Sequence, residues 1–304
     1  MRNLVIFLAA ALITSSAICA DNNQSAEQTP PPMKKGDELK SIIILEALGS
    51  RGTGGIFIGF NSENKEMVSV KTLFSDLAKE TIYKRQFKRE AITFRKLNHP
   101  NIIGYVDSGF DKGRYFIATE FVKGKTLADL VVGGKGLPVG IVLKSMSKVS
   151  DGVAHSHDKR ILHCDLRPQN IMVTTEGFVK IIDFGNAKKI GAMAFIDPKS
   201  CLRNPRYSSP EQNQGQKLDE RSDLYCLGLL FFELLTGRRA LYGSSLLEIT
   251  AFQMGSLFPQ PSKLNNKISP DLDKLVMKLL EKDPNNRYKS AAALIDDIKA
   301  IHQD

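Results

Sequence analysis

A glycine-rich stretch, residues 49–55, has a composition that could bind phosphate groups. It lies between two apolar runs, residues 42–48 and residues 56–58, which predicts two strands joined by a glycine-rich turn. Glycine has no Cβ, so backbone N–H groups there can approach phosphate oxygens closely. A glycine-rich hairpin is as often only a tight turn, so this stretch alone leaves both interpretations open. The candidate ligand-binding residues of this stretch and its two flanks are Leu48, Gly49, Ser50, Arg51, Gly52, Thr53, Gly54, Gly55 and Ile56.

Lys71 and Glu90 are predicted to form a buried ion pair. Lys71 lies in a β-rich run, residues 67–73, where a single lysine usually faces solvent. The segment that follows predicts a helix, because mainly apolar residues recur in it at steps of three and four positions. Glu90 shares the predicted inner face of this helix, and a buried carboxylate needs a partner such as a lysine on the adjacent strand. The other residues of that face are Ile82, Gln86, Phe87, Ala91, Phe94 and Leu97.

A second group of polar residues follows farther along the chain, between apolar runs. Residues 115–122 predict a strand, and Lys123-Gly124-Lys125 after it predicts a crossing between two lobes. The cleft between two lobes is a common ligand site. Beyond a predicted helix at residues 139–157 come His163, Cys164, Asp165, Arg167, Gln169 and Asn170, and then Asp183-Phe184-Gly185, which ends a predicted buried strand at residues 178–182.

The ordered set of these motifs resembles that of eukaryotic-like protein kinases and is most similar to bacterial serine/threonine members. A single glycine-rich turn is weak evidence, whereas the whole set in this order is very hard to reach by chance. The resemblance covers about residues 41–303. Its segments are the glycine-rich turn, residues 68–71, Glu90, His99-Pro100-Asn101-Ile102, residues 161–173, Asp183-Phe184-Gly185, Ser209-Pro210-Glu211, residues 223–228 and Arg287.

The resemblance implies an α+β, bilobal protein kinase fold. A small β-rich N-lobe with one key helix is expected at residues 41–121, and a larger, mainly helical C-lobe at residues 125–303. Residues 223–235 predict a helix that is apolar on nearly all sides, as a helix through the centre of a lobe must be.

The activity that the resemblance implies is that of a non-specific serine/threonine protein kinase, which uses ATP and Mg²⁺ to phosphorylate protein substrates. Such chemistry requires an attacking hydroxyl held in line and phosphate charge that is neutralised. By the resemblance, Lys71 held by Glu90 would bind the α and β phosphates. Asp183 and Asn170 would supply the hard oxygen ligands that Mg²⁺ prefers.

The resemblance also assigns the proton acceptor and the adenine site. Asp165 would accept the proton of the substrate hydroxyl. Arg167 stands where serine/threonine kinases usually have lysine, and its guanidinium can still reach the γ-phosphate. Backbone groups of Glu120 and Val122 would bind adenine, with Thr119 at the back of that pocket.

Three motif residues are expected to act as scaffold. Asp223 would accept backbone N–H groups of the loop that carries Asp165, and Arg287 would form a buried pair with Glu211. His163 is expected to be a packing residue, since the histidines lack the spacing of metal ligands.

Four residues depart from the family pattern. Arg51 replaces the usual second glycine of the turn, and Arg167 replaces lysine. Asn204 stands where a threonine usually contacts the catalytic aspartate, and Cys164 replaces the arginine that normally binds a phosphorylated activation segment. We therefore expect activity without phosphorylation of residues 186–208. The retained residues favour an active enzyme; the alternatives are a pseudokinase scaffold that binds nucleotide weakly or not at all, and a small-molecule kinase.

Composition fits a globular protein with a sizeable core. The chain has 304 residues, of which 42% are hydrophobic and 25% charged, and four cysteines, so a disulfide framework is not expected. Its formal net charge is +9, but the lysines and arginines are spread along the chain without a long basic run. We expect no nucleic-acid partner, and no pattern indicates an oligomeric state.

The N-terminus resembles a secretory signal peptide, residues 1–20. Arg2 precedes an apolar stretch that small residues end after about ten positions, short of the roughly twenty that span a membrane. Contact with a membrane is thus expected only during export, or through lipidation at Cys19 as the weaker alternative. Residues 21–40 predict a disordered linker. We expect an exported protein, secreted or in the cell envelope; the alternatives are a cytoplasmic protein or one delivered into a host cell, where ATP is abundant.

Overall fold

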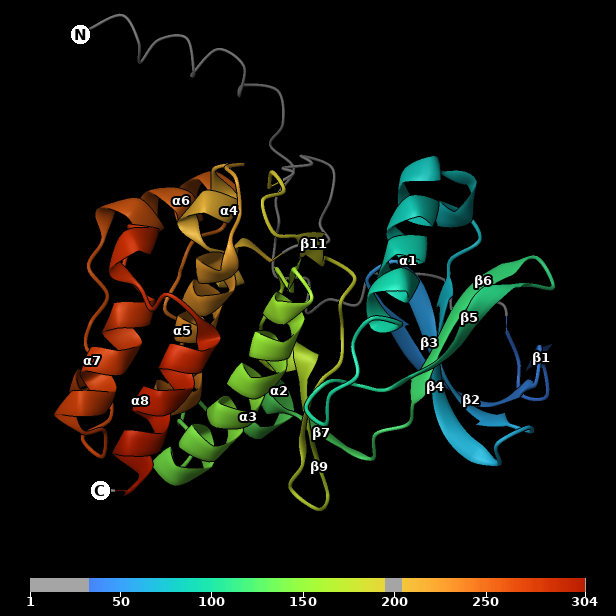
Figure 1. Ribbon diagram of the computed structural model, residues 1–304, viewed down its shortest axis with the longest axis horizontal. Helices are drawn as coiled ribbons and strands as arrows, with labels where there is room; N and C mark the ends of the chain where they lie inside the picture. Colours follow the sequence, from blue (N-terminus) through green and yellow to red (C-terminus); the bar gives the residue numbers. More distant parts are fainter. Residues whose placement is uncertain (1–32, 195–203, 304) are drawn as a thin grey trace, which may run out of the picture.

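The computed structural model describes residues 33–194 and 204–303. Within them a β-rich lobe and a mainly helical lobe stand side by side (Figure 1), which confirms the expected α+β, bilobal protein kinase fold. The predicted signal peptide, Cys19 and residues 21–32 of the predicted linker lie outside the described residues.

The N-lobe is built on a six-stranded antiparallel sheet with the order β1-β2-β3-β4-β6-β5. Its residues alternate between a buried core face and a second face, as in β4, where Val68 and Val70 are buried. Ser69 and Lys71 therefore point to the other side, toward the C-lobe. The strands are β1 Glu38–Leu39, β2 Ile42–Arg51, β3 Gly54–Asn61, β4 Glu66–Leu73, β5 Tyr105–Asp111 and β6 Arg114–Glu120.

The N-lobe begins earlier than the predicted boundary at residue 41. Leu39 of β1 pairs with Ile42 of β2, and Met33 and Leu39 are buried in the sheet's core. Residues 33–40 thus belong to the lobe, which corrects that part of the predicted linker. A two-residue strand is too short to show the alternation by which sequence reveals strands.

Helix α1, Thr81–Phe94, follows a short 3₁₀ helix, η1 (Leu77–Lys79), and lies on the side of the sheet nearer the C-lobe (Figure 1). Phe87, Glu90, Ala91 and Phe94 of its predicted inner face are buried, whereas Ile82 near its start is exposed. The core that Phe87 and Phe94 enter continues through Ile102 into the C-lobe. One hydrophobic cluster therefore joins α1 to the C-lobe.

The C-lobe surrounds helix α5, Glu220–Thr236, whose side chains are almost all buried. The side chain of Asp219 caps the helix by accepting the Arg221 backbone N–H, and Gly237 ends it with φ of +72°. The other helices are α2 Leu127–Leu130, α3 Val139–Asp158, α4 Pro210–Asn213, α6 Leu246–Gly255, α7 Pro270–Leu279 and α8 Ala291–Gln303, with the 3₁₀ helices η2 Pro168–Asn170, η3 Pro205–Tyr207, η4 Pro261–Lys263 and η5 Pro284–Asn286.

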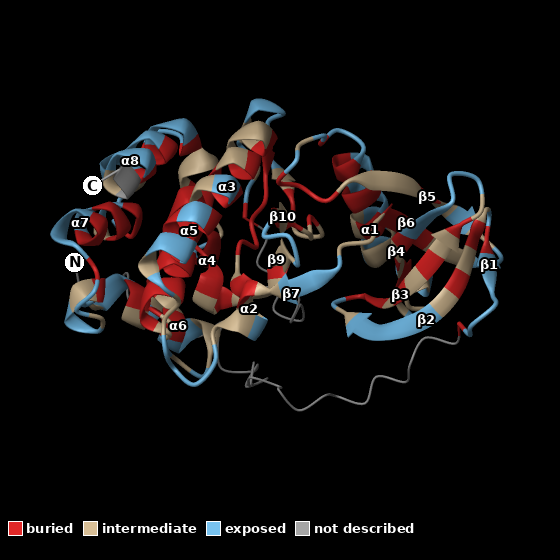
Figure 2. Ribbon diagram, turned by 90° about the horizontal axis from the view of Figure 1, so that it is seen from below, coloured by how far each residue is buried: buried red, intermediate tan, exposed pale blue. Residues whose placement is uncertain are grey.

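Short strands of the C-lobe form its edge toward the N-lobe. Strands β7 Gly124–Thr126, β9 Ile171–Thr174 and β10 Val179–Ile181 make one sheet, and β8 Ile161–Leu162 pairs with β11 Lys188–Lys189. Because β6 ends at Glu120 in one sheet and β7 begins at Gly124 in another, residues 121–123 make the crossing between lobes (Figure 2). None of the helices in residues 33–194 and 204–303 is long and apolar enough to span a membrane.

Candidate active site

A cleft with about 870 Å³ of empty space lies between the lobes. This volume includes space open to solvent, and a cleft between two lobes is a common ligand site. Its walls are mainly apolar, and Lys71, Glu90 and Asp183 give it a charged end. The lining residues are Leu48, Arg51, Ile56, Ser69, Lys71, Glu90, Phe94, Ile103, Ile117, Thr119, Glu120, Phe121, Val122, Thr126, Met172, Ile182 and Asp183.

The predicted pair of Lys71 and Glu90 is confirmed. Lys71 Nζ donates to both carboxylate oxygens of Glu90, at 2.8 and 2.9 Å, and the Glu90 side chain is only 4% exposed. Burial alone would lower the pKa of Lys71, but the negative charges of Glu90 and Asp183 outweigh it and raise that pKa. Lys71 therefore carries a stable positive charge into the cleft.

Asp183 lies next to this pair. Its Oδ1 accepts the Gly185 backbone N–H at 2.8 Å. Burial alone would raise the pKa of Asp183, but the positive charges of Lys71 and Arg51 outweigh it and lower the pKa to about 2. The neighbouring Phe184 is buried and packs edge-on against Phe94 of α1, with ring centroids 5.6 Å apart. This packing under α1 keeps the Asp183 carboxylate in the cleft.

Asp165 has several polar neighbours that orient its carboxylate. Asn170 Nδ2 donates to Asp165 Oδ2 at 3.0 Å and to its backbone carbonyl at 2.7 Å, and Asn186 Nδ2 donates to Oδ2 at 3.3 Å. Arg167 Nε lies 3.6 Å from Oδ1. Burial and the charge of Asp183 raise the pKa of Asp165, although Arg167 opposes the shift. The carboxylate is thus both oriented and more basic than usual.

The loop that carries Asp165 is tied to the centre of the C-lobe. Asp223 of α5 accepts the backbone N–H groups of His163 and Cys164, at 2.8 and 2.9 Å, so its predicted scaffold contacts are confirmed. His157 Nε2 lies 2.9 Å from the same carboxylate. The His163 ring packs on Phe184, and its Nδ1 accepts the Asp165 backbone N–H at 3.1 Å.

The predicted glycine-rich turn joins β2 to β3, and the second half of β2 is exposed (pale blue in Figure 2). Gly52 makes the turn with φ of +54°. Gly54 is required for a different reason, because a Cβ there would lie 2.1 Å from the Thr72 carbonyl oxygen of β4. Leu48, Arg51 and Ile56 line the cleft, and Gly52 lines its outer part. The lining of the cleft does not include the other described residues of this turn, which are Gly49, Ser50, Thr53, Gly54 and Gly55.

Arg51 crosses from the N-lobe into the polar part of the site. Its Nη2 donates to Asn170 Oδ1 and to the Gln169 carbonyl oxygen, each at 2.5 Å, and its Nε lies 3.6 Å from Asp183 Oδ2. The guanidinium thus contacts both residues that were expected to hold Mg²⁺. The sequence marks Arg51 as unusual but does not indicate the direction of its side chain.

Another wall of the cleft is formed by the end of β6 and the crossing between lobes. Thr119, Glu120 and Val122 line it, where the resemblance placed the adenine site. The Glu120 side chain points elsewhere: its Oε1 accepts the Gly104 backbone N–H at 2.8 Å and pairs with Lys180 Nζ at 2.5 Å. This ion pair was not predicted, and it fixes the crossing segment to β10.

The sequence also did not predict two contacts of the site, one made by Gln86 and one made by Asn186. Gln86 Nε2 donates to the Gly185 carbonyl oxygen at 2.9 Å, which ties α1 to the segment after Asp183. The sequence places Gln86 one helical turn before Glu90 on the same face of the helix, but it does not indicate this hydrogen-bond partner. Asn186, which contacts Asp165, carried no such signal.

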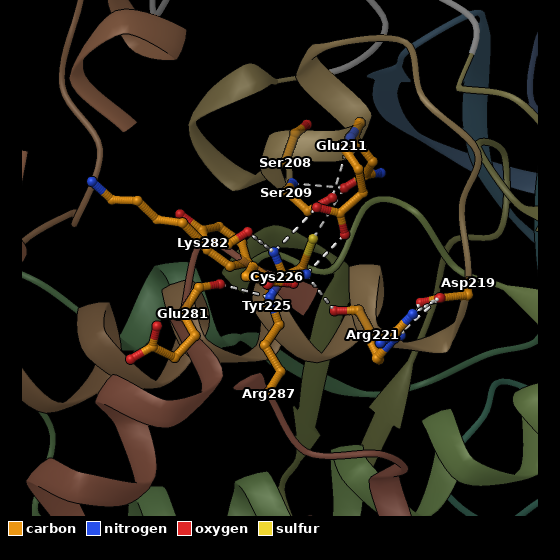
Figure 3. A network of polar contacts seen from close by, with 12 residues as sticks. Ser208, Ser209, Glu211, Asp219, Arg221, Tyr225, Cys226, Glu281, Lys282 and Arg287 are labelled. Carbon is orange, nitrogen blue, oxygen red and sulfur yellow. Dashed lines mark hydrogen bonds and ion pairs between the residues drawn. The ribbon is translucent and has the colours of Figure 1, made fainter. Parts of the chain in front are cut away.

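The predicted buried pair of Glu211 and Arg287 is confirmed, and Figure 3 shows the network around it. Arg287 Nη1 and Nη2 donate to the two Glu211 oxygens at 2.8 and 3.1 Å. Arg287 also donates to the backbone carbonyls of Arg221, Glu281 and Lys282. The pair joins α4 to the start of α5 and to the chain before α8.

The segment before α4 differs from the family at Asn204. Asn204 Oδ1 accepts the Arg206 backbone N–H at 3.1 Å and caps η3. Ser208 and Ser209 are fully buried; Ser209 caps α4 by accepting the Gln212 backbone N–H. Ser200 lies outside the described residues.

The fold and the site define a protein kinase domain, and comparison with known proteins agrees. The protein kinase domain family matches residues 42–297, so the chain belongs to the protein kinase family. It is 32% identical over 256 residues to the serine/threonine-protein kinase PrkC of Bacillus subtilis, covering 84% of this chain and 40% of PrkC. It is 33% identical over 263 residues to PknB of Mycobacterium leprae, covering 84% of this chain and 42% of PknB.

These matches span only about two fifths of the relatives' own length. Among solved structures, the kinase domain of Mycobacterium tuberculosis PknI superposes with a TM-score of 0.71 at 23% identity, covering 88% of this chain and 99% of that one. At this identity the likeness supports the fold alone.

Proposed function

We propose that the chain is an ATP-dependent serine/threonine protein kinase that uses Mg²⁺. The observation that carries the proposal is that Lys71, paired with Glu90, and the carboxylates of Asp165 and Asp183 all reach one interlobe site. A pocket that combines a stable cation with two carboxylates of different basicity suits phosphoryl transfer. The bacterial relatives named as serine/threonine kinases support the substrate class.

The residues present fit a magnesium ion. Asn170 Oδ1 and Asp183 Oδ2 both lie near the guanidinium of Arg51, so two hard oxygen donors of the kind that Mg²⁺ prefers face one cation. Bound there, Mg²⁺ would neutralise charge on the β and γ phosphates.

The other side chains of the site have separate roles in the proposed reaction. Lys71 binds phosphate oxygens and is held in place by Glu90. Asp165, oriented by Asn170 and more basic than usual, accepts the proton of the attacking hydroxyl. Arg167, beside Asp165, contacts the transferred phosphoryl group. The apolar walls of the cleft, with Thr119 and Val122 at the crossing, hold the adenine ring.

The test is transfer of radiolabel from ATP to a generic serine/threonine protein substrate by the full chain with Mg²⁺. We expect transfer that Asp165→Asn abolishes and that the matched exposed change Asp296→Asn leaves intact. Loss of transfer in all three proteins, with nucleotide binding retained, would contradict the proposal.

A nucleotide-binding pseudokinase scaffold is the second candidate. The observation in its favour is that Arg51 contacts Asn170 and Asp183, the expected metal ligands. Under this hypothesis Lys71→Met leaves the cellular effect of the chain unchanged, whereas an active kinase loses it. A small-molecule kinase is disfavoured by the ordered α4 segment around Glu211, which in this family supports a peptide substrate.

We also propose that the chain is exported by residues 1–20 and acts where ATP is available, as in a host cell. The support is the apolar stretch after Arg2. Mass spectrometry of the protein in cell fractions tests this, and finding only uncleaved protein in the producing cell's cytoplasm contradicts it.

A further inference from the structure

Arg51 links the two lobes through the most polar part of the cleft. It stands at the end of β2, whereas its partners lie in η2 and at the end of β10 in the C-lobe. The Arg51 side chain is 27% exposed and that of Asp183 17% exposed, so the contact is partly shielded from solvent. Such shielding strengthens a charge-assisted hydrogen bond relative to one at an open surface.

The guanidinium competes with the metal for the same atoms. Asn170 Oδ1 accepts from Arg51 Nη2 at 2.5 Å, and that oxygen is the one a metal at this position would need. Asp183 Oδ2 lies 3.6 Å from Arg51 Nε. A divalent cation bound to these oxygens would lie beside the Arg51 guanidinium and be repelled by its positive charge.

The electrostatics of the site agree with this competition. Asp183 faces the two cations Lys71 and Arg51, so positive charge already lies beside this carboxylate.

We propose that Arg51 is a latch that occupies the magnesium ligands in the nucleotide-free protein and must leave before Mg²⁺-nucleotide binds. The concentration of Mg²⁺ at which nucleotide occupies the cleft therefore depends on Arg51. The inference rests on the proposed use of ATP and Mg²⁺, and it goes beyond it by assigning a regulatory role to the residue that departs from the family's glycine.

Nucleotide affinity with and without metal tests the latch. A non-hydrolysable ATP analogue is titrated calorimetrically into the full chain, Arg51→Ala and Arg89→Ala, in excess Mg²⁺ and in EDTA. Arg89 is exposed on α1 and controls for the loss of one positive charge. With Mg²⁺ we expect Arg51→Ala to bind about tenfold more tightly than the parent, since the hydrogen bonds of the charged guanidinium to Asn170 and Gln169 no longer have to break.

The EDTA measurement separates a latch from a simple phosphate ligand. Without metal, Arg51→Ala leaves the Asp183 carboxylate less compensated near the phosphates, so we expect affinity equal to or lower than the parent's. Arg51→Ala should therefore change the affinity for the analogue in opposite directions, or by unequal amounts, in Mg²⁺ and in EDTA. Equal or weaker binding of Arg51→Ala in Mg²⁺ would overturn the proposal and make Arg51 a phosphate ligand or a bystander.

A second measurement uses no nucleotide. In hydrogen–deuterium exchange of the nucleotide-free protein, releasing Arg51 should free the turn, so peptides spanning residues 48–56 should exchange several-fold faster in Arg51→Ala than in Arg89→Ala. Unchanged exchange would overturn the latch. If no variant binds the analogue in either buffer, the proposed kinase function fails, and the exchange result alone decides whether Arg51 holds the turn.

Discussion

Asp223 holds Cys164 in a backbone conformation that residues with side chains rarely adopt. The Cys164 N–H donates to Asp223 Oδ1 at 2.9 Å, while the φ angle of Cys164 is +63°. The other oxygen of Asp223 accepts the His163 N–H, and Asp223 is fully buried in α5. The strained turn before Asp165 is therefore stabilised by one carboxylate in the centre of the C-lobe.

Asp223→Asn should destabilise the chain and reduce activity. The amide can offer one oxygen instead of two, so a buried N–H of the loop loses its acceptor, which costs about 2 kcal/mol in free energy of unfolding. Urea denaturation measures the loss, and Asp296→Asn, exposed on α8, is the control. A change of a few tenths of a kcal/mol or less would show that the loop does not depend on Asp223.

Glu90→Gln should slow phosphate transfer by about tenfold or more, because the neutral amide no longer fixes Lys71 by charge. The measured quantity is the rate of label transfer from ATP, with circular dichroism as the check on folding. Glu63→Gln, at an exposed turn, is the matched control. Unchanged transfer by Glu90→Gln would mean that Lys71 is positioned by other contacts.

The Glu211–Arg287 pair should make stability depend on pH in the acid range. Burial alone would raise the pKa of Glu211, but the hydrogen bonds and charge of Arg287 outweigh it and hold the pKa below its usual value of 4.5. The pair therefore stabilises the folded chain fully above pH 4.5. That contribution is lost as the pH falls through the lowered pKa of the folded state.

Glu211→Gln makes this dependence measurable. At neutral pH we expect the substitution to lower the free energy of unfolding by about 3 kcal/mol, because it leaves the buried Arg287 without its counter-charge. The difference between the parent and Glu211→Gln should shrink below pH 4.5, as followed by denaturant titration at a series of pH values. A difference that stays constant into the acid range would contradict the ion-pair assignment.

Activity should not require phosphorylation of residues 186–208, since Cys164 replaces the arginine that would bind the phosphate. Ser208 and Ser209 are fully buried, so intact-mass and peptide analysis should find them unmodified in the folded protein. Ser209→Ala should cost about 1 kcal/mol of stability because it removes the cap of α4. Alanine at Ser200, Ser208 or Ser209 that abolished turnover while leaving folding and ATP binding intact would refute this prediction.

Local patterns in the sequence were enough for one part of the site. The three- and four-residue steps of α1 place Glu90 on its inner face, and the cost of burying a charge then makes the lysine of the adjacent strand, Lys71, its expected partner. The Asp223 contacts and the Glu211–Arg287 pair came from the resemblance, since no local period relates residues so far apart.

Other contacts depend on how the lobes pack against each other. Arg51 reaches Asn170 and Asp183 only because the turn after β2 lies over η2 and the end of β10. The contact of Asn186 with Asp165 and the burial of Met33 in the N-lobe core likewise depend on how separate segments of the chain pack together. Periodicity reports which face of an element is buried, whereas the partner of a side chain that crosses between elements depends on their relative positions in space. The sequence by itself therefore determined the fold class and the residues available for phosphoryl transfer, and the tertiary structure decided that Arg51 lies on the proposed metal ligands.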